Sequence, residues 1–171
     1  MAMKELLRSN KMMIRRINES EIEECVAVIR TSFATVAKEF NLTKENCPTH
    51  TSFIPLKKLK MQFDRSCPMF AYIDDDKIVG YFSLIPQKDG NLELDNLAVL
   101  PDYRHKGYGA EMIRYAVDTA KTMNVDTIRI GIIEESMVLK NWYIKNGFKH
   151  IGTRKFEHLP FIVGFMEMKI S

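Results

Sequence analysis

Two glycines close behind a run of basic residues give this chain its clearest capacity for ligand chemistry. The segment reads Arg104-His105-Lys106-Gly107-Tyr108-Gly109-Ala110. Glycine lets the backbone approach a ligand closely, and the first N–H groups of a helix lack intrahelical partners and bind phosphate. The segment is therefore suited to hold a pyrophosphate, although a glycine turn without a ligand would show the same Gly-x-Gly pattern.

Two better-known phosphate motifs do not fit these residues. A P-loop ends in Gly-Lys-Ser/Thr, whereas Gly109 is followed here by Ala110 and Glu111. A dinucleotide-binding fingerprint has a third glycine at a position that Met112 occupies, and it usually lies nearer the start of its fold. Nucleotide binding through either motif is therefore not expected.

The predicted strand that precedes this loop has an irregular hydrophobic pattern. Its apolar residues change parity, from even at Leu92 and Leu94 to odd at Leu97 and Val99. A strand can keep one face buried through such a change only by inserting a residue. We therefore predict a β-bulge near positions 95 and 96, next to the glycine-containing loop.

The remaining elements follow from hydrophobic periodicity and turn signals. Ser20 with Glu23 predicts a capping box at the start of the first helix. Besides the strand at 92–100, we predict strands at 13–17, 69–73, 77–85, 127–133, 148–156 and 161–170. Helices are predicted at 20–41, around Leu56 to Phe63, from the glycine loop to about Met123, and at 137–146.

Composition indicates one globular domain and excludes several other classes. The chain has 171 residues, 46% of them hydrophobic, and its net charge of +3 is too small for a dedicated nucleic-acid binder. Three widely spaced cysteines and four histidines show no metal-ligand or disulfide spacing, so we expect no metal. Without an apolar run of about 20 residues, we expect no membrane segment and a cytoplasmic protein.

A resemblance to a known family now becomes visible. The segment Leu97-Ala98-Val99-Leu100-Pro101-Asp102-Tyr103-Arg104-His105-Lys106-Gly107-Tyr108-Gly109 resembles the acetyl-CoA-binding signature of the GNAT superfamily of N-acetyltransferases. There, a basic residue, two variable positions and Gly-x-Gly/Ala follow a bulged strand. Tyr143-Ile144-Lys145-Asn146-Gly147-Phe148 is similar to the family's Tyr-x-x-x-Gly-Phe ending, and Gly147 also fits a helix C-cap. The resemblance covers nearly all of 13–171 as one N-acetyltransferase domain and leaves 1–12 as an N-terminal extension.

The resemblance implies an α/β (α+β) fold with a mixed, mostly antiparallel seven-stranded sheet and helices on both faces. The central strands should splay at the bulge, so that acetyl-CoA enters the gap. Main-chain N–H groups of Arg104 to Ala110 would hold the pyrophosphate, and the Arg104 side chain either adds charge or is solvated. The resemblance implies acetyl-CoA contacts from Leu97, Ala98, Val99, Arg104, His105, Lys106, Gly107, Tyr108, Gly109, Ala110, Ser136 and Tyr143. Ser136 stands where many members have Asn.

A base must take a proton from the amine, because an alkylamine with a pKa of about 10.4 is mostly charged near neutral pH. Glu93 falls where some members keep a general-base glutamate, and Asp95 is a second candidate. A water could serve instead of either carboxylate, in which case Glu93 would be an ordinary solvent-facing side chain.

Tyr143 matches the family tyrosine that stands near the thioester sulfur and serves as general acid. A phenol can donate a proton to a leaving thiolate. The alternative is that Tyr143 only packs, together with Val138, Leu139 and Trp142, on the inner face of its helix.

The function implied is transfer of acetyl from acetyl-CoA to a primary amine by direct attack in a ternary complex. The acceptor is not identified, but 41–66 and the turn around His158 should shape its site. A GNAT-like sensor that binds acetyl-CoA without turnover is the main alternative, and a nucleic-acid-binding domain is a third. Homodimers are common among similar proteins, so a homodimer is compatible with the resemblance.

Overall fold

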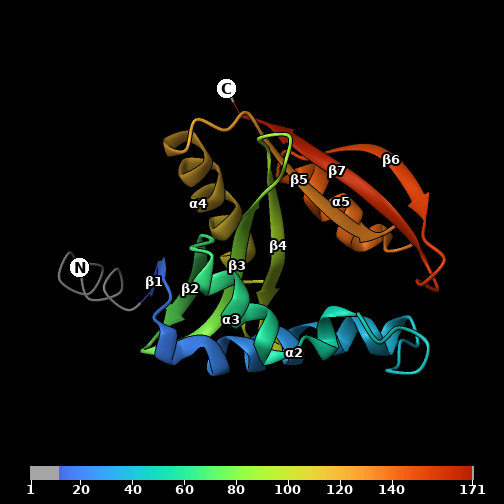
Figure 1. The fold of residues 1–171 in the computed structure, drawn as a ribbon, viewed down its shortest axis with the longest axis horizontal. Helices are drawn as coiled ribbons and strands as arrows, with labels where there is room; N and C mark the ends of the chain where they lie inside the picture. The colour runs from blue at the N-terminus through green and yellow to red at the C-terminus, as the bar shows by residue number, and fades with distance from the viewer. Residues whose placement is uncertain (1–11, 171) are drawn as a thin grey trace.

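The computed structural model describes residues 12–170 and shows one mixed sheet with its helices (Figure 1). The predicted N-terminal extension lies outside the described residues, except for Met12, which begins the first strand. The strands are β1 (Met12–Arg16), β2 (Met69–Asp74), β3 (Lys77–Pro86), β4 (Leu92–Val99), β5 (Thr127–Ile133), β6 (Lys149–Lys155) and β7 (Ile162–Lys169). The α-helices are α2 (Ile22–Glu39), α3 (Leu56–Asp64), α4 (Tyr108–Thr122) and α5 (Met137–Lys145). Short 3-10 turns are η1 (Glu19–Glu21), η2 (Thr51–Phe53) and η3 (Pro101–Tyr103).

The sheet has the seven strands predicted, and the structure places them in the order β1-β2-β3-β4-β5-β7-β6. All neighbouring pairs are antiparallel except β4 and β5, which run parallel and pair only at Leu92 with Ile128 and Glu93 with Arg129. Beyond these two pairs the strands separate toward α2, and Figure 1 shows the resulting V-shaped opening. The predicted splay of the central strands is therefore confirmed.

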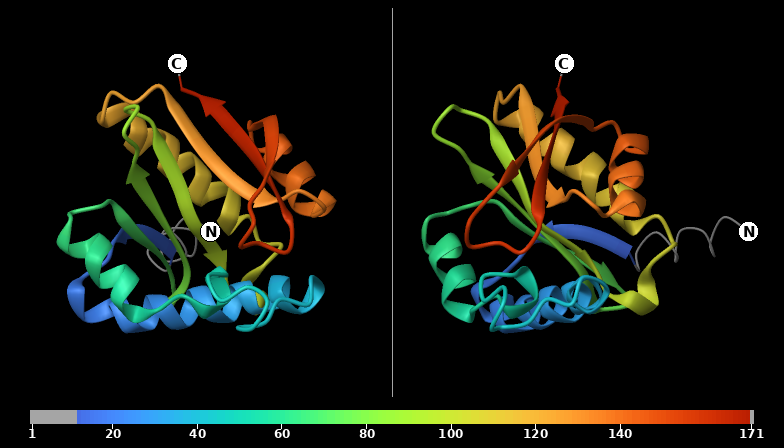
Figure 2. Two further views of the ribbon diagram at one scale, coloured as in Figure 1. Left: turned by 45° about the vertical axis from the view of Figure 1, so that its right-hand side comes forward. Right: turned by 90° about the vertical axis from the view of Figure 1, so that its right-hand side faces the viewer.

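Helices cover both faces of the sheet, and each face has its own apolar core. On one side Met112, Ile113 and Ala116 of α4 pack with Tyr143 of α5 against the sheet. On the other side α2 and α3 bury Cys25, Ile29 and Leu59 among others. Figure 2 shows α2 lying across the open end of the sheet. The fold class expected from the sequence is confirmed.

The predicted bulge lies on β4 where it pairs with β3. Tyr81 pairs with Ala98 and Ser83 with Asp95, so three steps along β4 match two along β3. Asn96 takes up the extra residue in a left-handed conformation, with φ 54°. Leu92 and Leu94 before the bulge, and Leu97 and Val99 after it, all pack into the α4-side core. The change of parity was therefore a correct indication of the bulge.

The capping box was predicted at the wrong place. The first helical residues come earlier, in η1, and the main-chain N–H of Asn18 donates to Glu21 Oε1 at 2.8 Å. Arg15 of β1 also binds Glu21, with Nη1 2.8 Å from Oε1. The ion pair between Glu21 and Arg15 of β1 therefore stabilises a capping box at Asn18 and Glu21 rather than one at Ser20 and Glu23. Among residues 12–170, no helix is long and apolar enough to cross a membrane.

Candidate active site

The loop between η3 and α4, together with the first residues of α4, presents a row of unpaired main-chain N–H groups. Across residues 12–170 no acceptor receives a hydrogen bond from the main-chain N–H of any residue from His105 to Ala110. We call these six residues the anion loop. His105 and Gly107 adopt left-handed conformations, with φ 63° and 84°. Left-handed residues before a helix allow successive N–H groups to converge, and such an arrangement can bind an anion.

Arg104, just before the anion loop, uses its hydrogen-bond donors inside the protein. Its main-chain N–H donates to Pro101 O at 3.3 Å, so this group belongs to the η3 turn rather than to the row of free donors. Its Nε donates to Val99 O, and its Nη groups bond to α2. The guanidinium therefore connects β4 to α2, a role that the sequence did not reveal.

The two glycines of the motif are required for different reasons. A Cβ on Gly107 would meet no atom within 4 Å, so this residue is glycine because of its positive φ and open surroundings. A Cβ on Gly109 would lie 2.9 Å from Trp142 Cζ2 and 3.0 Å from Cη2. Gly109 therefore allows α5 to approach α4 closely, in addition to its place in the anion loop.

Two tyrosines anchor the start of α4 to the β2–β3 hairpin. Tyr108 and Tyr72 stack with ring centroids 4.3 Å apart. The Tyr108 hydroxyl donates to Asp74, and the Tyr72 hydroxyl donates to Glu111. The Tyr108 side chain is buried in this contact, so only its main-chain N–H is available to a ligand.

The edge of β4 that faces β5 is free in the region predicted to hold the pantetheine arm. Among the residues that the structure describes, β4 has no strand partner on this side beyond Glu93, and Leu97 to Val99 lie in the open part of the V. Their backbone could therefore add a further extended chain by hydrogen bonding. The predicted pantetheine contacts of Leu97, Ala98 and Val99 remain predictions.

Tyr143 lies on α5, deep in the α4-side core. Its side chain is 7% exposed and makes edge-to-face contacts with Trp142 and Phe148, at centroid distances of 4.9 and 5.4 Å. Burial raises the pKa of this phenol above its usual value, so Tyr143 stays protonated at any pH near neutrality. It is available as a hydrogen-bond donor and not as a phenolate.

The C-terminus of α5 holds Tyr143 in place through a Schellman motif, as Gly147 indicated. Gly147 has φ 99°, and its N–H donates to Ile144 O at 3.1 Å. The N–H of Phe148 donates to Tyr143 O at 3.0 Å. At the other end of α5, Ser136 is the N-cap residue, but its side chain makes no capping hydrogen bond. Within residues 12–170 its hydroxyl has no hydrogen-bond partner, and its contact with acetyl-CoA stays a prediction.

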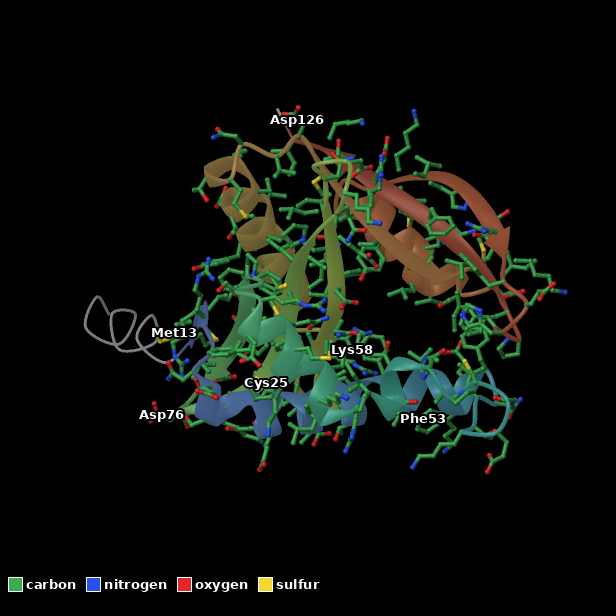
Figure 3. All side chains as sticks on the ribbon, viewed as in Figure 1. Met13, Cys25, Phe53, Lys58, Asp76 and Asp126 are labelled. Atoms are coloured by element: carbon green, nitrogen blue, oxygen red, sulfur yellow. The ribbon has the colours of Figure 1, made fainter. Side chains whose placement is uncertain are left out.

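Glu93 and Asp95 lie on the α3-covered face of β4. Gln62 of α3 donates to Asp95 Oδ2 at 3.4 Å. Lys58, which Figure 3 labels, lies four residues before Gln62 on the same helix. Burial, and next the charge of Asp95, raise the pKa of Glu93, whereas the charge of Lys58 lowers it. A carboxylate with a raised pKa is a better proton acceptor than an ordinary glutamate.

The two segments predicted to shape the acceptor site contact each other. Ala37, near the end of α2, and Leu42, just after it, pack with Ile133 and with Leu159 and Phe161 of the β6–β7 turn. Figure 2 shows this turn approaching the segment after α2. His158 lies in the same turn, with its ring 5.7 Å from that of Phe156. The sequence had indicated both segments as borders of the acceptor site.

Other candidate chemistry lies outside this site. Two surface hollows, one along α2 near Lys38 and one beside Cys67, include residues of the predicted acceptor segment 41–66 but none of the residues predicted to be catalytic or to contact acetyl-CoA. Within residues 12–170, no group of three or more His, Cys, Asp or Glu side chains could hold a metal ion. The anion loop, the open edge of β4, Glu93 and Tyr143 therefore define the candidate site.

Comparison with known proteins identifies the family to which this fold and site belong. The sequence model of the acetyltransferase (GNAT) family matches residues 33–148, which include the anion loop, β4 and α5. The chain belongs to this family.

Curated relatives match the chain in part. An uncharacterized N-acetyltransferase of Mycobacterium tuberculosis is 34% identical over 82 residues, covering 48% of this chain and 53% of the relative. The uncharacterized N-acetyltransferase YvbK of Bacillus subtilis is 31% identical over 74 residues, covering 43% of this chain and 48% of the relative. The chain spans about half the length of the curated relatives it matches.

Solved structures share the fold over nearly the whole chain. The PaiA N-acetyltransferase of Thermoplasma acidophilum in complex with coenzyme A has a TM-score of 0.72 at 22% identity, covering 92% of this chain and 98% of that one. The ribosomal-protein-S18-alanine N-acetyltransferase of Escherichia coli has a TM-score of 0.71 at 15% identity, covering 94% of each chain. At these identities the likeness concerns the fold.

Proposed function

We propose that this protein is an acetyl-CoA-dependent N-acetyltransferase that acts on a primary amine. The observation that carries the proposal is the row of six N–H groups at the anion loop that have no acceptor within residues 12–170, beside the free edge of a bulged strand. A pyrophosphate needs the former, and an extended amide-containing arm needs the latter. Family membership and the coenzyme A bound to a protein of the same fold support the pairing of the two.

In a direct transfer, Glu93 and Tyr143 have different roles. Glu93, or a water that it orients, takes the proton of the acceptor ammonium, so that the neutral amine attacks the thioester carbonyl carbon. The carbon–sulfur bond then breaks, and the Tyr143 hydroxyl donates a hydrogen bond or a proton to the leaving sulfur. Amide and free thiol are the products, and no covalent acyl-enzyme is required.

The test separates binding from turnover. Acetyl-CoA is titrated into the purified protein by calorimetry, and thiol release is then followed with a panel of primary amines and ribosomal and peptide N-termini. Binding with amine-dependent thiol release supports the proposal. Binding without release by any amine favours a sensor, and absence of binding removes acetyl-CoA as the ligand.

The pH dependence tests the assignment of the base. The acidic limb of kcat/KM should report the pKa of Glu93 in the free enzyme. Asp95→Asn removes a charge that raises this pKa, so the limb should move to lower pH. Lys58→Met removes a charge that lowers it, so the limb should move to higher pH. Profiles are measured with the best amine of the panel. If Asp95→Asn abolished the limb instead of moving it, Asp95 would be the base.

Glu93→Gln should lower activity and stabilise the fold at neutral pH. The pKa of Glu93 is raised in the folded protein, chiefly by burial, so its ionised form is less favourable there than in the unfolded chain. The resulting loss of stability appears as pH rises through this pKa and is absent at about pH 4, near the usual carboxyl pKa. Thermal unfolding should therefore show a higher Tm for the variant at neutral pH. An equal gain at both pH values would contradict this origin.

A further inference from the structure

Arg104 makes a two-pronged contact with the middle of α2. Its Nη2 donates to Ser32 O at 2.8 Å and its Nη1 donates to Thr35 Oγ1 at 3.1 Å. Thr35 Oγ1 itself donates to Ser32 O at 2.9 Å, which closes the arrangement. The third donor, Nε, reaches Val99 O at the end of β4, 3.2 Å away. One side chain therefore joins β4, the start of the anion loop and α2.

The contact requires the shape of a guanidinium. Ser32 and Thr35 lie one turn apart on α2, and the two Nη atoms of Arg104 match this pair while Nε faces β4. A lysine ammonium is a single point charge and cannot reproduce three donors in fixed directions. Burial of the guanidinium lowers the pKa of Arg104, as expected for a side chain removed from solvent. The donors used here are not available to a phosphate without breaking the contact with α2.

The helix that receives this contact continues to the acceptor side of the site. Two residues after Thr35, Ala37 of α2 packs with Leu42, which follows the helix, against Ile133 and the β6–β7 turn. These contacts join α2 to the segment 41–66 and to the β6–β7 turn, both of which were predicted to shape the acceptor site. A change in the order of α2 at Ser32 and Thr35 would therefore reach these segments.

We infer that Arg104 is a positioning residue that fastens the anion loop to α2 and transmits occupation of the loop to the acceptor side. The inference rests on the proposed function, because the loop must bind coenzyme A for occupation to matter. Binding of a ligand to the loop orders Arg104, and Arg104 in turn orders the second half of α2. The physical link is the pair of hydrogen bonds to Ser32 and Thr35.

Hydrogen exchange tests the transmission with coenzyme A alone, so that no acceptor is needed. Addition of coenzyme A to the full chain should slow amide exchange of residues 32–39 by about threefold or more, as expected when binding suppresses local opening. Thr35→Ser keeps the hydroxyl and should preserve this protection. Thr35→Val keeps the β-branched shape but removes the hydroxyl, and Arg104→Met removes the guanidinium donors. Both variants should still bind coenzyme A but lose the protection of residues 32–39.

A double-mutant cycle on the affinity for coenzyme A identifies the route of the effect. We expect Arg104→Met to raise the Kd about tenfold and Thr35→Val about threefold, neither of which exceeds the contribution of a hydrogen bond to a charged group. Because both act through one contact, the double variant should bind no more weakly than Arg104→Met. The exposed position of Thr35 keeps Thr35→Val folded, which circular dichroism and thermal unfolding would verify.

Two results would overturn the inference. Parent protein that binds coenzyme A without protection of residues 32–39 would show that α2 does not respond to the loop. A Thr35→Val variant with the parental Kd, together with an Arg104→Met variant whose affinity depends less on salt, would show that Arg104 contacts phosphate directly. Failure of the parent to bind coenzyme A would instead contradict the proposed function, so the two failures are distinct.

Discussion

Gly107→Glu should reduce the affinity for acetyl-CoA about 100-fold or more. The residue lies at the centre of the six free N–H groups, where a carboxylate would repel the pyrophosphate and its side chain would occupy the approach. A non-glycine residue at φ 84° also costs about 1–2 kcal/mol, because Cβ crowds the carbonyl oxygen in the left-handed region. Calorimetric titration of acetyl-CoA into the variant measures the loss directly.

Two further substitutions at Gly107 separate charge from backbone strain. Asn tolerates the left-handed conformation, so Gly107→Asn should retain most of the affinity. Gly107→Gln has the bulk of Glu without its charge and should fall between the two. Gly109 is a poorer place for this test, because any Cβ there meets Trp142 and would displace α5 together with Tyr143. Tight binding by a folded Gly107→Glu variant would exclude the anion loop as the pyrophosphate site.

Tyr143→Phe should lower kcat about 100-fold, at the lower end of the contribution of a general acid. Phe preserves the edge-to-face contacts with Trp142 and Phe148, so only the hydroxyl is lost. Because the hydroxyl acts on the sulfur as it leaves, kcat and kcat/KM should fall together while the Kd for acetyl-CoA stays near the parental value. Steady-state thiol release and calorimetry on the same preparation check both expectations.

Tyr115→Phe is the matched control for the loss of a phenol. Tyr115 lies on α4 and packs its ring against Phe70, at a centroid distance of 5.2 Å, outside the candidate site. Its variant should keep the parental kcat. If Tyr143→Phe also stayed within about threefold of the parent, well below the contribution of a general acid, Tyr143 would serve only to pack α5 against the core.

Much of the fold could be predicted because local patterns determine it. The strand at Thr127 to Ile133 and the C-cap at Gly147 were predicted at the positions where they occur. The bulge on β4 followed from a change of hydrophobic parity, since a strand facing one core must correct its register. These features depend on backbone conformation and on burial of neighbouring residues. Both are determined by short stretches of sequence.

The candidate site was only partly visible in the same way. The glycines, Glu93 and Tyr143 were found from motif spacing, and their predicted roles await the experiments above. The sequence could not show that Gly109 makes room for Trp142, or that Asp74 binds the Tyr108 hydroxyl. Because these partners are far apart in the sequence, they come into contact only in the assembled fold.

The sequence by itself therefore determined the elements, their order and the loop able to bind an anion. Tertiary structure decided which side chains remain available to a ligand. Arg104 shows the difference, because a solvated arginine, a phosphate-binding arginine and a tie to Ser32 and Thr35 are indistinguishable in sequence. Periodicity reports whether a residue is buried, whereas the direction of a long polar side chain depends on the partners that the folded chain brings within hydrogen-bond reach.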